Sequence, residues 1–181
     1  YELNIPTEQA AHVYDLIVER GDVFGLRHAG LKALASLRME KAYRDYGHDI
    51  DNTDDPYEVG LGFAVNLNKE CDFIGKQACI EKKAAAPYGR RLVQVLVKDP
   101  EPQMYHGEIV LRDGVPVGDI RAAAYGHTLG GAVGLAMVEG ETVDKAYLDE
   151  GSWAVEIAGK TYPAEVSFRP MYDPGMERIR A

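Results

Sequence analysis

The stretch RLVQVLVK (residues 91–98) is a run of β-forming residues and predicts a strand. Similar short runs follow it along the chain, at 108–112, 132–138, 153–157 and 161–168. Asp113-Gly114 turns the second run into Val115-Pro116-Val117, and Gly159-Lys160 turns the fourth run into the fifth. Many short strands with glycine turns predict a small barrel or sandwich for this half of the chain.

Before Pro87 the character of the chain is different, because helical patterns replace strand patterns. Helices are expected over 7–21 with Thr7 as N-cap, over about 27–43, and over 74–86. The apolar side of the first helix would hold Ala11, Tyr14, Leu16, Ile17 and Val18, and that of the second Leu31, Leu34, Ala35 and Leu37. The run over 61–67 is expected to be a short buried strand. The predicted fold class is α+β, with a mixed α/β region over 1–87 and a mostly β domain over 88–181.

Composition excludes several classes of protein. The chain has 181 residues, 46% of them apolar, so it can bury a core, and its formal net charge of −9 opposes binding to nucleic acid and to anionic lipid. No apolar stretch is long enough to span a bilayer. Cys71 and Cys79 are spaced neither as a redox pair nor as zinc ligands, so reduced structural thiols are favoured over a disulfide. A cytoplasmic protein, or one of the mitochondrial matrix in a eukaryote, is expected.

Common motifs of catalysis and metal binding are missing from the sequence. The histidines form no HExxH pattern, the glycine clusters lack the dinucleotide and P-loop spacings, and Ser36 has no Gly-x-Ser-x-Gly context. His48 beside Asp49 is either an acid/base pair or, as we favour, a structural histidine at a helix end. No metal site is predicted.

Arg90-Arg91 is the most suggestive short feature, because it places two guanidinium groups together in an acidic chain. Such a pair is suited to a carboxylate ligand, which it can hold through forked, charge-assisted hydrogen bonds. The alternative is a solvated start of the strand, and the residues alone favour this alternative.

Longer segments carry a resemblance to a known family. SLRMEKAYRDYGHDI (residues 36–50), DPYEVGLGFAVNLNK (55–69), DFIGKQA (72–78) and RRLV (90–93) resemble, in order, segments of the glycine cleavage T-protein (aminomethyltransferase) family. The variants, with PMYDPGMERIR (170–180), are most similar to the folate-binding half of dimethylglycine and sarcosine dehydrogenases and oxidases. The resemblance spans essentially the whole chain.

The resemblance implies a fold and a reaction. The chain would supply the end of a central folate-binding α/β region and a C-terminal antiparallel β-barrel. The family passes a one-carbon unit to tetrahydrofolate. In the dimethylglycine and sarcosine branch, the donor is an imine formed from a small N-methyl amine by a separate flavin domain, so FAD would belong only to a domain upstream.

The resemblance also implies site residues. The family's pterin-binding glutamate corresponds to Glu2, whose carboxylate can accept the ring N–H and the exocyclic amine in parallel. Leu3 and Asn4 would contact the same edge, and Phe63 would pack against the flat pterin. Tyr172 and Arg91 are weaker candidates, with Arg91 a partner for the carboxylates of the folate tail.

Two departures from the family pattern qualify this assignment. Leu34 and Ala35 stand where glycine cleavage members carry arginine and aspartate, which favours the dehydrogenase-linked branch. The family's essential aspartate and a pterin-contacting tyrosine would lie upstream of Tyr1, so no catalytic residue is assigned in this chain. We therefore expect an inactive C-terminal fragment of a longer enzyme. The alternatives are a glycine cleavage aminomethyltransferase or folate-dependent demethylase on the same scaffold, and a non-catalytic binding module.

Overall fold

The computed structural model describes residues 2–180, apart from the side chain of Ile179. The chain divides into two compact units, Tyr1–Lys32 and Ala33–Ala181. Among the described residues, no helix combines the length and the apolar character that crossing a membrane requires.

The first unit consists of an extended segment, helix α1 (Thr7–Gly21) and the 3-10 turn η1 (Asp22–Phe24). The predicted helix has the expected bounds, but the prediction of Thr7 as N-cap is wrong. Pro6 occupies the cap position, no side chain caps the helix, and Thr7 is its first residue. Pro6 has an extended backbone, with φ −55° and ψ 141°, and it has no N–H to leave unpaired at the start of the helix. None of the residues of α1 is buried.

Helix α2 (Leu31–Glu40) is shorter than predicted at both ends. It stops because Ala42 adopts a positive φ of 52° and the N–H of Tyr43 turns back to the carbonyl oxygen of Arg38. The predicted apolar side is also wrong, since the leucines on that side are exposed. The buried residues of α2 are instead Ser36, Met39 and Glu40.

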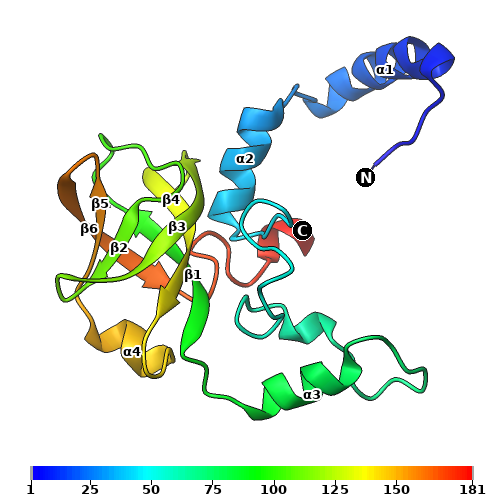
Figure 1. The fold of residues 1–181 in the computed structure, drawn as a ribbon. Coiled ribbons are helices and arrows are strands. Elements are labelled where there is room, and N and C mark those ends of the chain that lie inside the picture. Colours follow the sequence, from blue (N-terminus) through cyan, green and yellow to red (C-terminus); the bar gives the residue numbers. More distant parts are fainter. Residues whose placement is uncertain (1, 181) are drawn as a thin grey trace. The chain divides into compact units, whose positions relative to one another are not determined.

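Six antiparallel strands form a closed barrel in the second unit (Figure 1), which confirms the predicted fold class. The strands are β1 (Arg90–Val97), β2 (Ile109–Arg112), β3 (Val115–Gly126), β4 (Gly131–Glu139), β5 (Trp153–Ile157) and β6 (Lys160–Ser167). Their order around the barrel is β1-β4-β3-β2-β5-β6. Strand β3 continues far beyond the predicted Val115–Val117 run, because its alanine-rich second half pairs with β4 over its whole length.

Strand β1 is buried on both of its faces, which explains its nearly continuous apolar run. Val93, Val95 and Val97 point into the barrel core. Leu92 and Leu96 point to the other side, into a second core. That second core is completed by residues of the segment before the barrel, Met39, Ala42, Ile50 and Val59, and by Val133, Leu135 and Met137 of β4.

The segment between α2 and the barrel is mostly turns. The expected strand over 61–67 is wrong, since Gly62–Ala64 forms the 3-10 turn η2 and Gly60 takes a positive φ of 73°. A short apolar run does not by itself distinguish a strand from a turn. Helix α3 (Lys76–Ala84) is confirmed within two residues at each end. Two short helices were not anticipated, α4 (Lys145–Glu150), capped by the Asp144 carboxylate, and α5 (Glu177–Arg180).

Candidate functional site

Two buried carboxylates of the 36–50 segment hold that segment together and join it to the barrel. Asp49 is fully buried and accepts hydrogen bonds from Arg38 at 2.6 and 3.2 Å, which closes the loop after α2. Glu40, only 2% exposed, accepts hydrogen bonds from the N–H groups of Thr128 and Leu129 at 2.6 and 3.0 Å, in the turn between β3 and β4. Arg38, Glu40 and Asp49 therefore fix the shape of this part of the chain, and none of them lines the cavity that the segment borders.

Two further contacts hold the C-terminal tail beside α2. The side chain of Gln94, in β1, donates to the carbonyl oxygens of Met39 and Glu40 and accepts from the N–H of Met171 at 2.6 Å. Lys41 donates to the carbonyl oxygen of Asp173 at 2.7 Å, and its Nζ lies 3.2 Å from the carboxylate of that residue. The tail therefore forms one side of the space between α2 and the strand β1.

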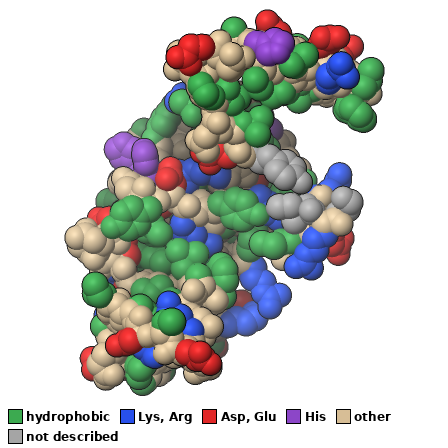
Figure 2. Space-filling view, turned by 90° about the vertical axis from the view of Figure 1, so that its right-hand side faces the viewer, with side chains coloured by type: hydrophobic (Ala, Val, Ile, Leu, Met, Phe, Trp, Pro, Cys, Tyr) green, Lys and Arg blue, Asp and Glu red, His purple; other side chains and the backbone are tan. Residues whose placement is uncertain are grey.

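A cavity of about 710 Å³ lies within the second unit, between the 41–63 segment, the start of β1 and the tail. Its volume is in the range of about 300–1,000 Å³ that small-molecule sites occupy. On the face drawn in Figure 2, Lys and Arg side chains lie among hydrophobic ones. The basic residues that line the cavity are Lys41, Arg44, Arg91 and Arg169, and its apolar and aromatic residues include Tyr43, Tyr46, Leu61, Phe63, Phe168 and Met176.

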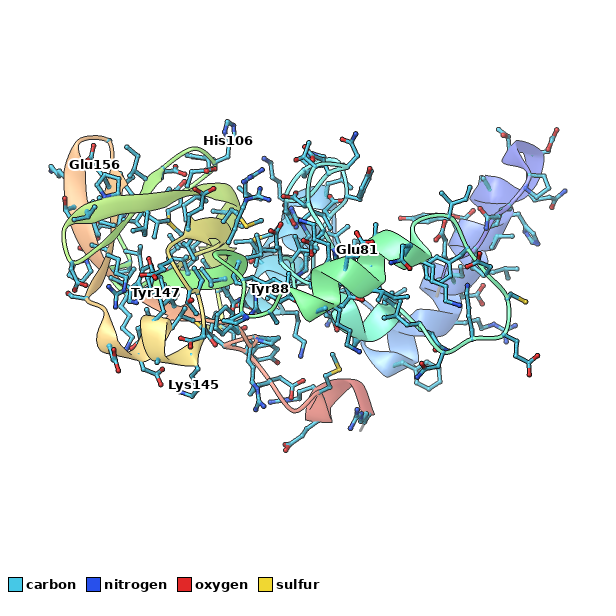
Figure 3. All side chains as sticks on the ribbon, turned by 60° about the horizontal axis from the view of Figure 1, so that its bottom comes forward. Glu81, Tyr88, His106, Lys145, Tyr147 and Glu156 are labelled. Atoms are coloured by element: carbon cyan, nitrogen blue, oxygen red, sulfur yellow. The ribbon has the colours of Figure 1, made fainter. Side chains whose placement is uncertain are left out.

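Arg91 enters this cavity at the start of β1. Its guanidinium group lies 4.4 Å from the ring centre of Phe168 and 5.7 Å from that of Tyr88. Tyr88 is labelled in Figure 3, where the chain passes from α3 into the barrel. Its Nε is buried and has no hydrogen-bond partner among the described residues. Burial lowers the pKa of Arg91, although the charges of Tyr88 and Asp55 partly oppose this shift. The group therefore has an unused donor in an apolar, aromatic setting.

Arg44 lines the same cavity from the loop after α2. Its Nε donates to the carbonyl oxygen of Val59 at 2.9 Å, and its Nη1 to that of Ala42 at 2.7 Å. Burial lowers the pKa of Arg44, the charge of Asp49 opposes the shift, and the charge of Arg91 adds to it. Neither the motif patterns nor the resemblance pointed to Arg44, because its role depends on the fold of the loop.

Arg90 and Arg91 do not act as the pair that their adjacency suggested. Arg90 forms ion pairs with Asp54 at 2.7 Å, Glu58 at 3.2 Å and Glu139 at 3.7 Å, and it does not line the cavity that Arg91 enters. Successive strand residues point to opposite sides, which separates the two guanidinium groups.

The other residues predicted for the site lie in two places, in or beside the cavity and in the first unit. Phe63 lies in η2, is 87% exposed and lines the cavity together with Arg91. Tyr172 is half-buried beside the cavity wall, with the Lys41 Nζ 5.8 Å from its ring centre. Glu2, Leu3 and Asn4 are exposed in the extended segment of the first unit, and their assignment to a pterin stays a prediction.

His48 and Asp49 form no acid/base pair. Both oxygens of the Asp49 carboxylate accept hydrogen bonds from Arg38, and His48 instead lies 3.5 Å from the carboxylate of Asp45. Cys71 and Cys79 are free thiols. Within residues 2–180, no group of His, Cys, Asp and Glu is arranged to hold a metal ion.

Comparison with known proteins gives relatives in several functional classes. The chain is 44% identical over 180 residues to 4-methylaminobutanoate oxidase (formaldehyde-forming) of Paenarthrobacter nicotinovorans. It is 32% identical over 183 residues both to mouse mitochondrial sarcosine dehydrogenase and to the mouse mitochondrial pyruvate dehydrogenase phosphatase regulatory subunit. These matches cover 99%, 99% and 94% of the chain, but only 21%, 20% and 21% of the respective relatives. The chain therefore spans about a fifth of the length of these relatives.

A solved structure and two family models agree on the fold. The aminomethyltransferase T of the Bartonella henselae glycine cleavage system superposes with a TM-score of 0.71 over 88% of this chain and 44% of its own, at 22% identity, which supports the fold alone. The GCVT N-terminal domain model matches residues 1–69, and the glycine cleavage T-protein C-terminal barrel domain model matches residues 90–173. With both domain models in order along one chain, and a closed antiparallel barrel where the second one lies, the protein belongs to the glycine cleavage T-protein family.

Proposed function

We propose that this chain is the C-terminal part of a tetrahydrofolate-dependent one-carbon transfer enzyme of the dimethylglycine and sarcosine dehydrogenase-like branch, and that it supplies one part of the folate pocket. The observation that carries the proposal is the cavity that Phe63 and Arg91 line together, in a chain of this family. Relatives that match nearly the whole chain include an oxidase and a dehydrogenase of N-methyl amino acids. The partners would be folate, a one-carbon donor derived from a small N-methyl amine, and upstream domains.

Tetrahydrofolate fits the chemistry of the residues present. Its benzoyl ring and its carboxylates match an aromatic wall and guanidinium groups, and the unused Nε donor of Arg91 would find an acceptor in a carboxylate. Phe63 and Tyr172 offer flat surfaces for a ring. Glu2 would accept hydrogen bonds from the pterin edge. When bound, tetrahydrofolate supplies the amines that take up the carbon.

The chain's own residues would then orient the ligand and exclude water from it. No catalytic residue is assigned to residues 1–181, and we expect the chain without its upstream domains to be inactive. Any FAD would belong to an upstream domain. We place the protein in the cytoplasm, or in the mitochondrial matrix if it comes from a eukaryote, as its mitochondrial relatives suggest.

A second candidate function is a non-catalytic binding module. It is favoured by the relative that is described as a regulatory subunit, which matches 94% of the chain at 32% identity, close to the 99% and 32% of the dehydrogenase. In that case the barrel fold would serve in protein regulation, and the affinity for reduced folate would be lost.

Titration of the full-length natural protein with tetrahydrofolate distinguishes these candidates. We expect saturable binding and a loss of about tenfold or more in Glu2→Ala, since the variant removes a forked, charge-assisted contact. Glu8→Ala, which removes an exposed carboxylate from the first turn of α1, is the matched control and should bind as the unaltered protein does. Absence of binding by the unaltered protein rejects the folate function. Equal affinity in Glu2→Ala rejects only the assignment of Glu2.

A further inference from the structure

The tail after the barrel forms one wall of the cavity, yet most of it is held there without burial. Pro170 and Met176 line the cavity, and between them the tail, red in Figure 1, passes the end of α2. Residues 172–178, all of which the structure describes, include no buried residue. A segment with so few buried contacts opens locally at a low cost in free energy. We call residues 172–178 the strap.

The strap begins at a fixed point. Met171 is partly buried against the second core, and its N–H donates to the side-chain oxygen of Gln94 at 2.6 Å. Gln94 is itself only 2% exposed, and its amide nitrogen donates to the carbonyl oxygens of Met39 and Glu40. The tail is therefore anchored as far as Met171, and a movement of the strap would pivot at this residue.

Asp173 attaches the strap to α2 and also sets its shape. Its carbonyl oxygen accepts hydrogen bonds from the Lys41 Nζ at 2.7 Å and from the N–H of Met176 at 3.0 Å. Its carboxylate accepts hydrogen bonds from the N–H groups of Glu177 and Arg178 and lies 3.2 Å from the Lys41 Nζ. The residue that binds Lys41 is thus the one that places Met176 at the cavity.

The strap has a single polar attachment. Among the described residues, Lys41 is the only partner outside the strap for its hydrogen bonds and ion pairs. The same ammonium group lies 5.8 Å from the ring centre of Tyr172. Loss of this one side chain would therefore free the whole strap beyond its pivot.

The attached strap holds two residues in an unfavourable backbone conformation. Asp173 has a φ of 45° and Met176 a φ of 56°, in the left-handed region that residues with a side chain rarely adopt. Gly175, which could adopt this region without strain, does not. Such strain persists only where neighbouring contacts impose it, and it is concentrated at ligand clamps and switch regions. Release from Lys41 would therefore relieve strain as well as break contacts.

We propose that the strap is a gate of the cavity, which Lys41 holds closed through Asp173 and which opens by pivoting at Met171. Asp173 does not line the cavity, so it is a positioning residue that acts through Met176. Opening would remove the wall that Met176 forms and would admit or release a ligand. The inference rests on the proposed function only in one respect, because tetrahydrofolate is then the ligand whose entry and exit the gate controls.

The first test needs no ligand. Leu92 lines the cavity and is only 2% exposed, so a thiol in its place reports access to the cavity wall. Leu92→Cys is made in the full-length natural protein with Cys71→Ser and Cys79→Ser, which remove the two other thiols of this chain. We expect Lys41→Met to raise the rate at which the neutral reagent N-phenylmaleimide modifies this thiol about tenfold.

Two controls separate opening of the gate from general loosening. Lys145→Met removes an exposed lysine that pairs with Asp149 and should leave modification of the Leu92→Cys thiol unchanged. Val155→Cys replaces Leu92→Cys as a reporter in the barrel core, where Val155 is 0% exposed. Lys41→Met should leave the modification rate of this second thiol unchanged.

The second test measures the kinetics of tetrahydrofolate binding by rapid mixing. It uses Asp173→Asn, because Lys41 itself lines the cavity and Asp173 does not. We expect the association and dissociation rate constants both to rise about fivefold, while Kd changes less than about twofold. The reason is that a contact outside the ligand site is lost equally from the free and the bound protein. Glu177→Gln, which removes an exposed carboxylate of the same strap, is the matched control and should change neither rate.

The outcomes separate the gate from the folate function. An unchanged rate of modification of Leu92→Cys in Lys41→Met, or an equal rise at Val155→Cys, overturns the gate. Unchanged binding rates in Asp173→Asn, or a change in dissociation alone, also overturn it. If modification of Leu92→Cys rises as expected but the unaltered protein does not bind tetrahydrofolate, the gate stands and the folate function fails. If tetrahydrofolate binds and neither test responds to the strap, the folate function stands and the gate fails.

Discussion

Lys41 and Asp173 are joined twice, through a 2.7 Å hydrogen bond from the Lys41 Nζ to the Asp173 carbonyl oxygen and a 3.2 Å ion pair to its carboxylate. The two residues lie 132 positions apart in the chain, at the end of α2 and in the tail after the barrel. The Asp173 carboxylate also accepts hydrogen bonds from the N–H groups of Glu177 and Arg178. This one residue therefore organises the tail and attaches it beside the cavity.

Replacement of Lys41 should release the tail from α2 without unfolding the barrel. In Lys41→Met, the amide hydrogens over 171–178 should exchange about tenfold faster, because Asp173 loses both of its contacts with Lys41 and the bond from Met171 to Gln94 alone still holds the tail, while those of β1 and β4 stay protected. Hydrogen exchange followed by mass spectrometry measures this difference. Lys145→Met removes an exposed i,i+4 partner of Asp149 and should leave exchange over 171–178 unchanged. Uniformly faster exchange in Lys41→Met would mean that the tail is not a separable element.

Acid should release the tail through the same carboxylate. Burial raises the pKa of Asp173, but hydrogen bonds from the N–H of Glu177 and from Lys41 outweigh it, and the net pKa lies below the ordinary 3.8. Because the folded-state pKa is lowered, the stabilisation is present above pH 3.8 and is lost as the pH falls through the lower folded-state value.

The carboxyl carbon signal of Asp173 in an NMR titration reports this pKa, and exchange over 171–178 reports the release. We expect both to change together in the acid range below pH 3.8. Asp173→Asn should show rapid exchange at neutral pH and no acid-dependent step from this site. A midpoint at or above 3.8 would contradict the hydrogen-bonding account.

Truncation of the Glu40 side chain should lower the free energy of unfolding, because this carboxylate joins α2 to the barrel. Glu40→Ala removes the buried acceptor of the N–H groups of Thr128 and Leu129, and since Thr128 is itself exposed and can turn to water, we expect a loss of about 2 kcal/mol in the free energy of unfolding. Glu40→Gln retains an acceptor oxygen and should lose about 1 kcal/mol. Urea denaturation measures both values.

The control for Glu40 is Glu156→Ala, on the exposed side of β5 (Figure 3). It should change the free energy of unfolding by no more than about 0.5 kcal/mol. A similar small change in Glu40→Ala would mean that solvent satisfies the turn and that Glu40 does not join α2 to the barrel.

The barrel was predictable from the sequence because its strands have local signals. Asp113-Gly114 marks one hairpin, and the predicted Gly159-Lys160 turn lies one residue from the observed turn at Ala158-Gly159. Strand β1 is so apolar that its assignment hardly depends on context. The second half of β3 carries no such signal, since its alanines are compatible with a helix and only pairing with β4 makes them a strand.

The candidate site was predictable only in part, and for a physical reason. Phe63 and Arg91 were inferred from the resemblance, and the structure brings them to one cavity. Arg44 was missed because its guanidinium group is placed by the carbonyl groups of Val59 and Ala42, and backbone contacts of that kind leave no residue pattern. Leu31, Leu34 and Leu37 recur every three residues, yet all three are exposed. Such a period indicates that a helix has an apolar side, but it does not indicate what covers that side.

The predicted boundary near residue 87 can be tested through the second core, which joins the segment before the barrel to the barrel wall. A fragment of residues 88–181 would expose Leu92, Leu96 and Met137, because the side chains that cover them, including Met39 and Val59, would be absent. A fragment of residues 33–181 keeps both sides of that core.

We therefore expect the 88–181 fragment to bind the dye ANS and to unfold at a lower temperature than the 33–181 fragment. Trp153 is the single tryptophan and lies in the barrel core, where its Nε1–H donates to the carbonyl oxygen of Leu148, so its fluorescence reports the barrel in both fragments. Equal midpoints with no dye binding would make 88–181 an independent domain. A lower midpoint would mean that the barrel and the segment over 33–87 fold as one unit, because the apolar outer face of β1 needs its cover.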